Sequence, residues 1–224
     1  MSGANSAMKQ LSSETHDAST LQELGRASVQ IVHDLKNQLN GLKLYATFLR
    51  KRMESSDRPA DELETIGKLI AGLERAANDM TTLVRYGRPV ELRQIPTDLL
   101  KIVNASEKPA YITIESEGDG LSGVFDVAAM TEAFGAITAY AIRPASSARR
   151  EDVRIRLARD VEKSEAVVEW QGTKSDNGDD PFQSLARGEG VRMALARKII
   201  EAHGGHAETD ATVLRVRLPL KQQT

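Results

Sequence analysis

Apolar residues recur every seven positions through the first part of the chain. Leu21, Ser28, Leu35, Leu42 and Leu49 fall at one seam position of this repeat, and Leu24, Ile31, Gln38 and Tyr45 fall at the other. Neighbouring apolar positions widen the stripe at Val32, Leu39 and Ala46. No proline interrupts residues 20–53, so the pattern predicts one helix of about 34 residues, roughly 50 Å long.

A second periodic segment runs from about Ala60 to Tyr86 and predicts a second helix. The break "SSDRPAD" precedes it, with Pro59 placed to open the helix, and "GRP" ends it. Two such helices form a hairpin with one broad apolar face, which a hairpin of this length cannot cover alone. We expect two copies to pair in a four-helix bundle and make a homodimer. The alternative is that the second half of the chain covers this face.

The rest of the chain alternates between strand and helix patterns. "VRIRLARD", "AVVEW" and "VLRVRLPL" have the alternation of strands, whereas "DVAAMTEAFGAITAYAI" and "VRMALARKIIEAHGG" have the spacing of helices. A mixed sheet with helices on one face follows, which is an α+β two-layer sandwich. The predicted organisation is a flexible polar tail over 1–18, the helical hairpin over 19–88 and the sandwich over 89–224.

Composition excludes several kinds of chemistry. The 224 residues include no cysteine, which excludes disulfides, thiolate metal sites and cysteine nucleophiles and fits a reducing cytoplasm. A net charge of -2 argues against general nucleic-acid binding. No stretch has the roughly 18 consecutive apolar residues that span a bilayer, and the polar N-terminus lacks the apolar core of a signal peptide. We therefore expect a cytoplasmic protein with neither nucleic acid nor membrane as a partner.

The stretch "IVHDLKNQLNGL" places polar side chains within the helical pattern. With Leu35 at the first heptad position, His33 falls opposite the seam, and Asn40 shares its position one heptad on. This register disfavours a buried structural histidine. A metal site would need a second histidine or a carboxylate one turn away, where Asn37 is a poor ligand, so no metal is predicted. Two interpretations remain: a solvated histidine without a role, and a nucleophilic imidazole whose ring Asp34 orients or deprotonates.

The order of these features resembles the bacterial histidine-kinase family. "VHDLKNQLNGL" looks like that family's H-box, and "GEGVRMALARKIIEAHGG" looks like the last motif of its ATP-binding domain. The resemblance runs from residue 21 to 220. It implies that His33 is phosphorylated through the ring nitrogen farther from the backbone, that Asp34 assists proton transfer, and that Asn37 helps a receiver's aspartyl phosphate to be hydrolysed. It also implies a dimeric four-helix bundle followed by a sandwich of the histidine-kinase ATPase type.

Two nucleotide-binding motifs of that family are altered in this sequence. The asparagine that holds Mg²⁺ in the family falls on Tyr140, and a phenol does not replace a metal-binding amide oxygen. The aspartate that recognises adenine falls on Trp170 or Gln171. The nearby "SDNGDDPF" lies too far along its loop, and we interpret it as a solvated Asn-Gly turn.

The phosphate loop of the last motif is altered as well. Gly188 and Gly190 remain from the family pattern, but Arg192 replaces a later glycine, and its side chain would crowd the approach of backbone to phosphate. Together with Tyr140, this loop predicts that binding of ATP and Mg²⁺ is lost or weak and that the protein has no cofactor.

The leading hypothesis is a histidine phosphotransfer protein, similar to the kinase-derived dimeric phosphotransferases. His33 would carry a phosphoryl group between the aspartates of response-regulator receiver domains in a two-component phosphorelay. Lys36, Asn40 and Lys43 lie beside it as candidate receiver-docking residues, since basic side chains steer acidic partners; a merely solvated face is the alternative. The other hypotheses are a divergent ATP-dependent histidine kinase and a non-catalytic receiver-binding adaptor or phosphatase.

Overall fold

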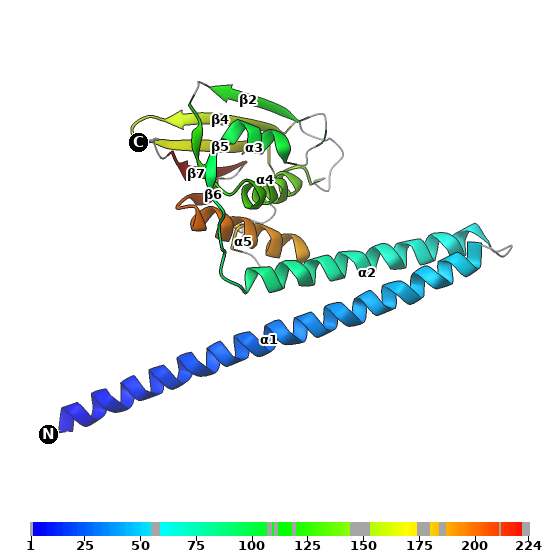
Figure 1. The fold of residues 1–224 in the computed structure, drawn as a ribbon, viewed down its shortest axis with the longest axis horizontal. Coiled ribbons are helices and arrows are strands. Elements are labelled where there is room, and N and C mark those ends of the chain that lie inside the picture. The colour runs from blue at the N-terminus through cyan, green and yellow to red at the C-terminus, as the bar shows by residue number, and fades with distance from the viewer. Residues whose placement is uncertain are drawn as a thin grey trace. The chain divides into compact units, whose positions relative to one another are not determined.

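The computed structural model divides the chain into two compact units, Met1–Arg88 and Pro89–Thr224 (Figure 1). The described residues are 2–54, 59–106, 109, 112–117, 120–143, 153–173, 180–183, 187–210 and 212–220, with side chains described outside 2–27 and 187–188. The first unit is the predicted helical hairpin, and the second is the predicted sheet covered by helices.

The hairpin consists of α1 (Ser2–Glu54) and α2 (Ala60–Tyr86). The bounds of α2 match the prediction, and Pro59 precedes its first turn. Where the sequence predicted a flexible tail over 1–18, the structure has α1 beginning at Ser2. Those residues contain one glycine and no proline. Extending an existing helix costs far less than starting one, so a helix founded on the apolar repeat continues through a polar segment that has no breaker.

The side of α1 that faces α2 is not the predicted seam. Within the hairpin, Ala46 on α1 is buried, as are Ile66, Ile70 and Ala77 on α2. Val32 and Leu39, at the same heptad position as Ala46, are half-buried. The seam residues instead remain exposed by 40–72%: Ile31, Leu35, Leu42, Tyr45 and Leu49. The stripe that dominates the sequence pattern is therefore an uncovered face of the hairpin.

The second unit is built on a five-stranded sheet with the order β2-β4-β5-β7-β6. Its strands are β2 (Thr113–Glu117), β4 (Arg154–Asp160), β5 (Glu165–Gln171), β6 (His206–Asp210) and β7 (Val213–Pro219). The pair β2–β4 is parallel and the other pairs are antiparallel. A separate antiparallel pair joins β1 (Ile95–Asp98) to β3 (Ser122–Phe125). The short polar strands β3 and β6 escaped the sequence prediction because neither has an alternating apolar run.

Helices cover one face of this sheet. They are α3 (Leu99–Ala105), α4 (Val127–Ala141) and α5 (Arg187–Ala202), and α4 and α5 lie together on one side of the sheet (Figure 1). Between helices and sheet, the Phe134 and Trp170 rings pack with centroids 5.5 Å apart. The indole Nε1–H of Trp170 donates to Thr138 Oγ1 at 2.8 Å, and both residues are fully buried. The two-layer α+β architecture is thus confirmed.

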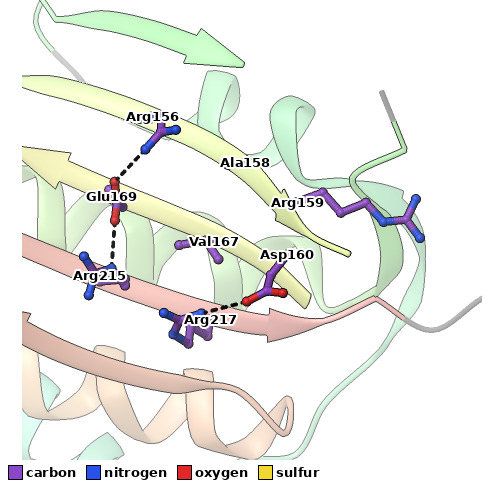
Figure 2. A pocket seen from close by; sticks show the side chains of 8 residues that line it. All are labelled: Arg156, Ala158, Arg159, Asp160, Val167, Glu169, Arg215 and Arg217. Carbon is purple, nitrogen blue, oxygen red and sulfur yellow. Dashed lines mark hydrogen bonds and ion pairs between the residues drawn. The ribbon is translucent and has the colours of Figure 1, made fainter. Parts of the chain in front are cut away.

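The other face of the sheet carries a transverse row of alternating charges. Glu115, Arg156, Glu169, Arg215 and Glu208 stand directly opposite one another on successive strands. The carboxylate of Glu169 lies 3.5 Å from the Arg156 guanidinium and 2.7 Å from that of Arg215 (Figure 2). Burial raises the pKa of Glu169, but hydrogen bonds from Arg215 and Gln171 outweigh it and leave the pKa lowered.

A shallow hollow of about 360 Å³ lies on this open face beside the charged row. Its inner arginines Arg156, Arg215 and Arg217 are each bound to carboxylates, as Figure 2 shows for Glu169 and Asp160. Burial of the Glu208 carboxyl raises its pKa, but hydrogen bonds from Arg215 and charge from both Arg215 and Arg217 leave that pKa lowered. The three inner arginines of the hollow are therefore paired with carboxylates on strands of the same sheet.

The carboxylate of Asp126 ties three parts of the second unit together. It caps α4 by accepting from the Ala129 N–H at 3.0 Å, and it also accepts from the Arg93 N–H at 2.8 Å. The backbone N–H of Asp126 donates in turn to Nε2 of the buried His203 at 3.0 Å, while Nδ1 of that ring lies 2.8 Å from the Ile199 carbonyl. The hydrogen bonds from Ala129 and Arg93 hold the pKa of Asp126 below its ordinary value of 3.8.

We expect Asp126→Asn to weaken the second unit in a pH-dependent way. Because the pKa of Asp126 is lowered on folding, its ionised form contributes stability above the unfolded-state pKa, and that contribution is lost as the pH falls through the folded-state pKa. At neutral pH the loss is expected to be roughly 0.3–1 kcal/mol, the scale of a negative charge at a helix N-terminus. Urea unfolding over a pH series checks this: the gap between wild type and variant should shrink below about pH 4. A gap that stays constant with pH would contradict the role of the ionised carboxylate.

Candidate functional site

The candidate site centres on His33, which is 53% exposed in the second half of α1. Asn37 and Asn40 are also exposed, four and seven residues further on, so the three side chains share one side of the helix. The exposed apolar stripe through Leu35 and Leu42 lies on a different side, because those positions are offset by two residues from His33 and Asn40. The helix therefore presents the imidazole away from its apolar stripe.

The neighbours of His33 gather at one nitrogen of its ring. Nδ1 lies 3.4 Å from the Asn37 side-chain nitrogen and 3.6 Å from Asp34 Oδ1. The Gln30 side-chain amide donates to the same Asp34 oxygen at 3.1 Å, which fixes the position of that carboxylate. The side chains of Asp34 and Asn37 are thus both close to Nδ1 of the ring.

This arrangement favours one tautomer of the imidazole. A carboxylate accepts hydrogen bonds only, so Asp34 favours a proton on Nδ1. The Asn37 amide accommodates that proton by presenting its oxygen, since amide nitrogen and oxygen exchange places by rotation of the side chain. With Nδ1 protonated, the lone pair of the neutral ring lies on Nε2. The chemistry available here is nucleophilic attack by Nε2, with Asp34 stabilising the charge that develops on the ring.

The three residues predicted to dock a receiver occupy different positions. The Lys43 ammonium lies 2.7 Å from Glu74 on α2, and this hydrogen bond lowers the pKa of the Glu74 carboxyl. Lys36 is half-buried on the same side of α1, whereas Asn40 is exposed beside His33. Lys43 thus links the two helices, and of the three only Asn40 shares the open side with the imidazole.

Two apolar side chains on the side of His33 were missed by the sequence prediction. Leu44 is 54% exposed and Phe48 is 61% exposed. They follow His33 by eleven and fifteen residues, which is about three and four helical turns, so they lie in line with it. The signal was present in the spacing, but the stronger heptad stripe of Leu35, Leu42 and Leu49 concealed it.

The predicted remains of a nucleotide site lie where α4 ends and α5 begins. Tyr140 is in the last turn of α4, and the Arg143 guanidinium lies 3.8 Å above its ring. Arg143 Nη1 also donates to Glu189, in the first turn of α5, at 3.1 Å. Gly188 lies in the same turn of the helix, and Gly190 is buried there. These side chains bring the two helix ends into contact.

The predicted adenine position offers no carboxylate from β5. Trp170 is buried in the core, and the Gln171 side chain donates to Glu169 at 3.1 Å. The stretch "SDNGDDPF" falls mostly outside the described residues. At its end Asp180 accepts from the Phe182 N–H at 2.9 Å. Among the side chains that the structure describes, no group of three histidine, aspartate or glutamate residues could hold a metal ion.

A hairpin that carries an exposed histidine, followed by an α+β sandwich, is the two-domain architecture of histidine kinases. No protein-family model matches the sequence. Sensor protein CutS, from Streptomyces coelicolor and from Streptomyces lividans, is 25% identical to the chain over 249 aligned positions in both cases. These alignments cover 98% of the chain but 60% of each relative, so the chain spans well under two thirds of their length.

Solved structures of histidine kinases share the fold. The match to full-length ShkA in complex with AMPPNP covers 87% of this chain and 46% of the ShkA chain, with a TM-score of 0.63 and 12% identity. ThkA in complex with response regulator protein TrrA matches 95% of the chain and 66% of its own, with a TM-score of 0.62 and 16% identity. The chain thus has the fold of these histidine kinases, a helical hairpin followed by an α+β domain of the ATPase type. Among the helices of the described residues, none is long and apolar enough to cross a membrane.

Proposed function

We propose that the chain is a histidine phosphotransfer protein that carries a phosphoryl group on His33 between receiver-domain aspartates. The observation that carries this proposal is the exposed imidazole of His33, whose Nδ1 lies 3.6 Å from Asp34 and 3.4 Å from Asn37. We assign Nε2 as the nucleophile because Asp34 favours a proton on Nδ1. The solved complex of ThkA with the response regulator TrrA supports receivers as the class of partner. The line of Asn40, Leu44 and Phe48 is the surface we assign to the receiver.

The proposed step is a transfer from an acyl phosphate to the imidazole. Nε2 attacks phosphorus, a nitrogen–phosphorus bond forms, and the bond between phosphorus and the aspartate oxygen breaks, releasing a carboxylate. The ring becomes positively charged in the product, with a proton on Nδ1. The Asp34 carboxylate, 3.6 Å from Nδ1, stabilises that charge or takes up the proton. Reversal of the same step returns the phosphoryl group to a second receiver.

We also propose that the protein acts as a homodimer. The exposed stripe on α1 continues on α2 in Leu69, which is 54% exposed, and Leu83, which is 38% exposed. An apolar surface that follows both helices of a hairpin at heptad spacing fits a second copy of the same surface, as in four-helix bundles. The imidazole lies on a different side of α1 from this stripe, so pairing would leave His33 open to a receiver.

The experiment compares two phosphoryl donors. Purified full chain is incubated with radiolabelled ATP in one arm and with a receiver phosphorylated by labelled acetyl phosphate in the other. We expect label to reach the chain from the receiver and to be lost in His33→Gln, whereas His206→Gln, at an exposed histidine of β6, transfers like wild type. Asp34→Asn is expected to slow transfer by roughly 10²-fold, the scale of general acid–base assistance.

The outcomes separate the candidate functions. Label that reaches His33 from ATP without any receiver would replace the proposal with a divergent histidine kinase. Loss of phosphate from the receiver without label on the chain, abolished by Asn37→Ala, would identify a phosphatase. Binding of the receiver with no transfer in either direction would identify an adaptor.

A further inference from the structure

Three side chains of the second unit form a cluster between α4 and α5. Arg143 is held at three points: its Nε donates to the Tyr140 carbonyl at 3.3 Å, its Nη1 donates to Glu189 at 3.1 Å, and its guanidinium stacks 3.8 Å from the Tyr140 ring. The Arg143 side chain is 29% exposed and the Glu189 side chain is 57% exposed, so solvent reaches the ion pair mainly from the side of Glu189. We call Tyr140, Arg143 and Glu189 the α4–α5 latch.

The latch places a charge of each sign at the two helix ends. Glu189 lies in the first turn of α5, where backbone N–H groups and the helix dipole favour negative charge. A carboxylate there already satisfies the electrostatic preference that a phosphate would otherwise meet. The guanidinium of Arg143 lies over the π face of Tyr140, where the ring quadrupole stabilises a cation. The cluster is thus an anion and a cation in mutual contact.

These residues do not fit a magnesium nucleotide. Mg²⁺ is bound by oxygen ligands, and a fixed guanidinium over the ring of Tyr140 repels a divalent cation. A phosphate that approached the start of α5 would meet the carboxylate of Glu189, which repels it. We propose that the α4–α5 latch is an intramolecular ion pair that takes the place of metal and phosphate and keeps nucleotide out of the domain. This inference concerns the second unit alone and does not depend on phosphotransfer by His33.

The first test measures nucleotide binding by calorimetry on the full chain, with AMPPNP and Mg²⁺ as the probe. Wild type is expected to give no binding heat at millimolar nucleotide. Opening the latch in the Arg143→Ala/Glu189→Gln double variant is expected to strengthen binding by at least about tenfold, which corresponds to 1.4 kcal/mol. Binding to wild type would overturn the proposal. Absence of binding to a folded double variant would also overturn it, since another feature would then exclude nucleotide.

The second test asks whether the latch residues act as a pair. Thermal unfolding is measured for Arg143→Ala, Glu189→Gln and their combination. The double variant is expected to lose less than the sum of the two single losses in Tm. Additive losses would overturn the latch.

The latch variants also separate this inference from the proposed function. All of them should accept phosphoryl groups from a phosphorylated receiver as wild type does, because His33 and its neighbours lie in the hairpin. A wild-type chain that accepts phosphoryl groups but also binds nucleotide refutes the latch alone. A wild-type chain that excludes nucleotide but accepts no phosphoryl group refutes phosphotransfer alone.

Discussion

Replacing Leu42 with aspartate is expected to convert the proposed dimer into monomers. Leu42 lies in the exposed stripe of α1 and is 54% exposed in the single chain. Burying a leucine contributes about 1.5–3 kcal/mol, and a two-fold symmetric interface contains the position twice. A buried unpaired carboxylate adds a further cost. The dissociation constant should therefore rise by roughly 10²–10⁴-fold, at about tenfold per 1.4 kcal/mol.

The matched control for this change is Leu44→Asp. Leu44 has the same exposed fraction of 54% and lies on the same helix, but on the side of His33. It should leave the dimer intact while weakening binding of the receiver. Light scattering after size-exclusion chromatography gives the mass of each variant. A dimeric Leu42→Asp variant, or a monomeric wild type, would contradict the proposed face.

Replacing Trp170 with alanine is expected to cost the second unit about 3–5 kcal/mol of stability. The indole is fully buried and packs against Phe134, so truncation opens a cavity at the centre of the core. It also leaves the hydroxyl of the buried Thr138 without the indole donor 2.8 Å away. Trp170→Phe should retain much of the packing and lose mainly this hydrogen bond, at about 1 kcal/mol.

Urea unfolding followed by far-ultraviolet circular dichroism measures both variants. Trp170 is the single tryptophan of the chain, so its fluorescence reports on the second unit in wild type but is absent from the variants. The Thr138→Val/Trp170→Phe double variant is the control: removing both partners should cost less than the sum of the single changes. If Trp170→Ala unfolds within about 1 kcal/mol of wild type, the assigned core is wrong.

The pattern of apolar residues predicted most of the elements but not their contacts. It predicted α2 from about Ala60 to Tyr86, and it predicted a strand over "VRIRLARD", whose Ile155 and Leu157 are buried. It also identified the stripe through Leu35 and Leu42, yet it could not say which partner the stripe meets. A heptad repeat records that a side of a helix is apolar, and α1 has two such sides; only packing distinguishes the one that meets α2.

For the candidate site too, the sequence predicted the exposure of single residues but not the contacts between distant ones. The exposure of His33 agrees with its predicted register, and His33 lies off both the heptad stripe and the side of α1 that packs on α2. The link between Lys43 and Glu74 joins residues 31 positions apart, and the pair Arg143–Glu189 joins residues 46 positions apart. Contacts between residues this far apart in the sequence depend on the path of the intervening loops. Local sequence patterns do not determine that path, so neither pair could be predicted.

The charged row on the open face of the sheet affects whether the sheets of two molecules can pair edge to edge. Its two ends lie on the outermost strands, and both ends are acidic: Glu115 on β2 and Glu208 on β6. Sheet edges are the places where strands of separate molecules join by backbone hydrogen bonding. Joining β2 or β6 of one molecule to either edge of another would bring carboxylates together without an arginine between them. With an acidic residue at each end of the row, repulsion between like charges opposes edge-to-edge pairing of two molecules in the register that aligns their rows.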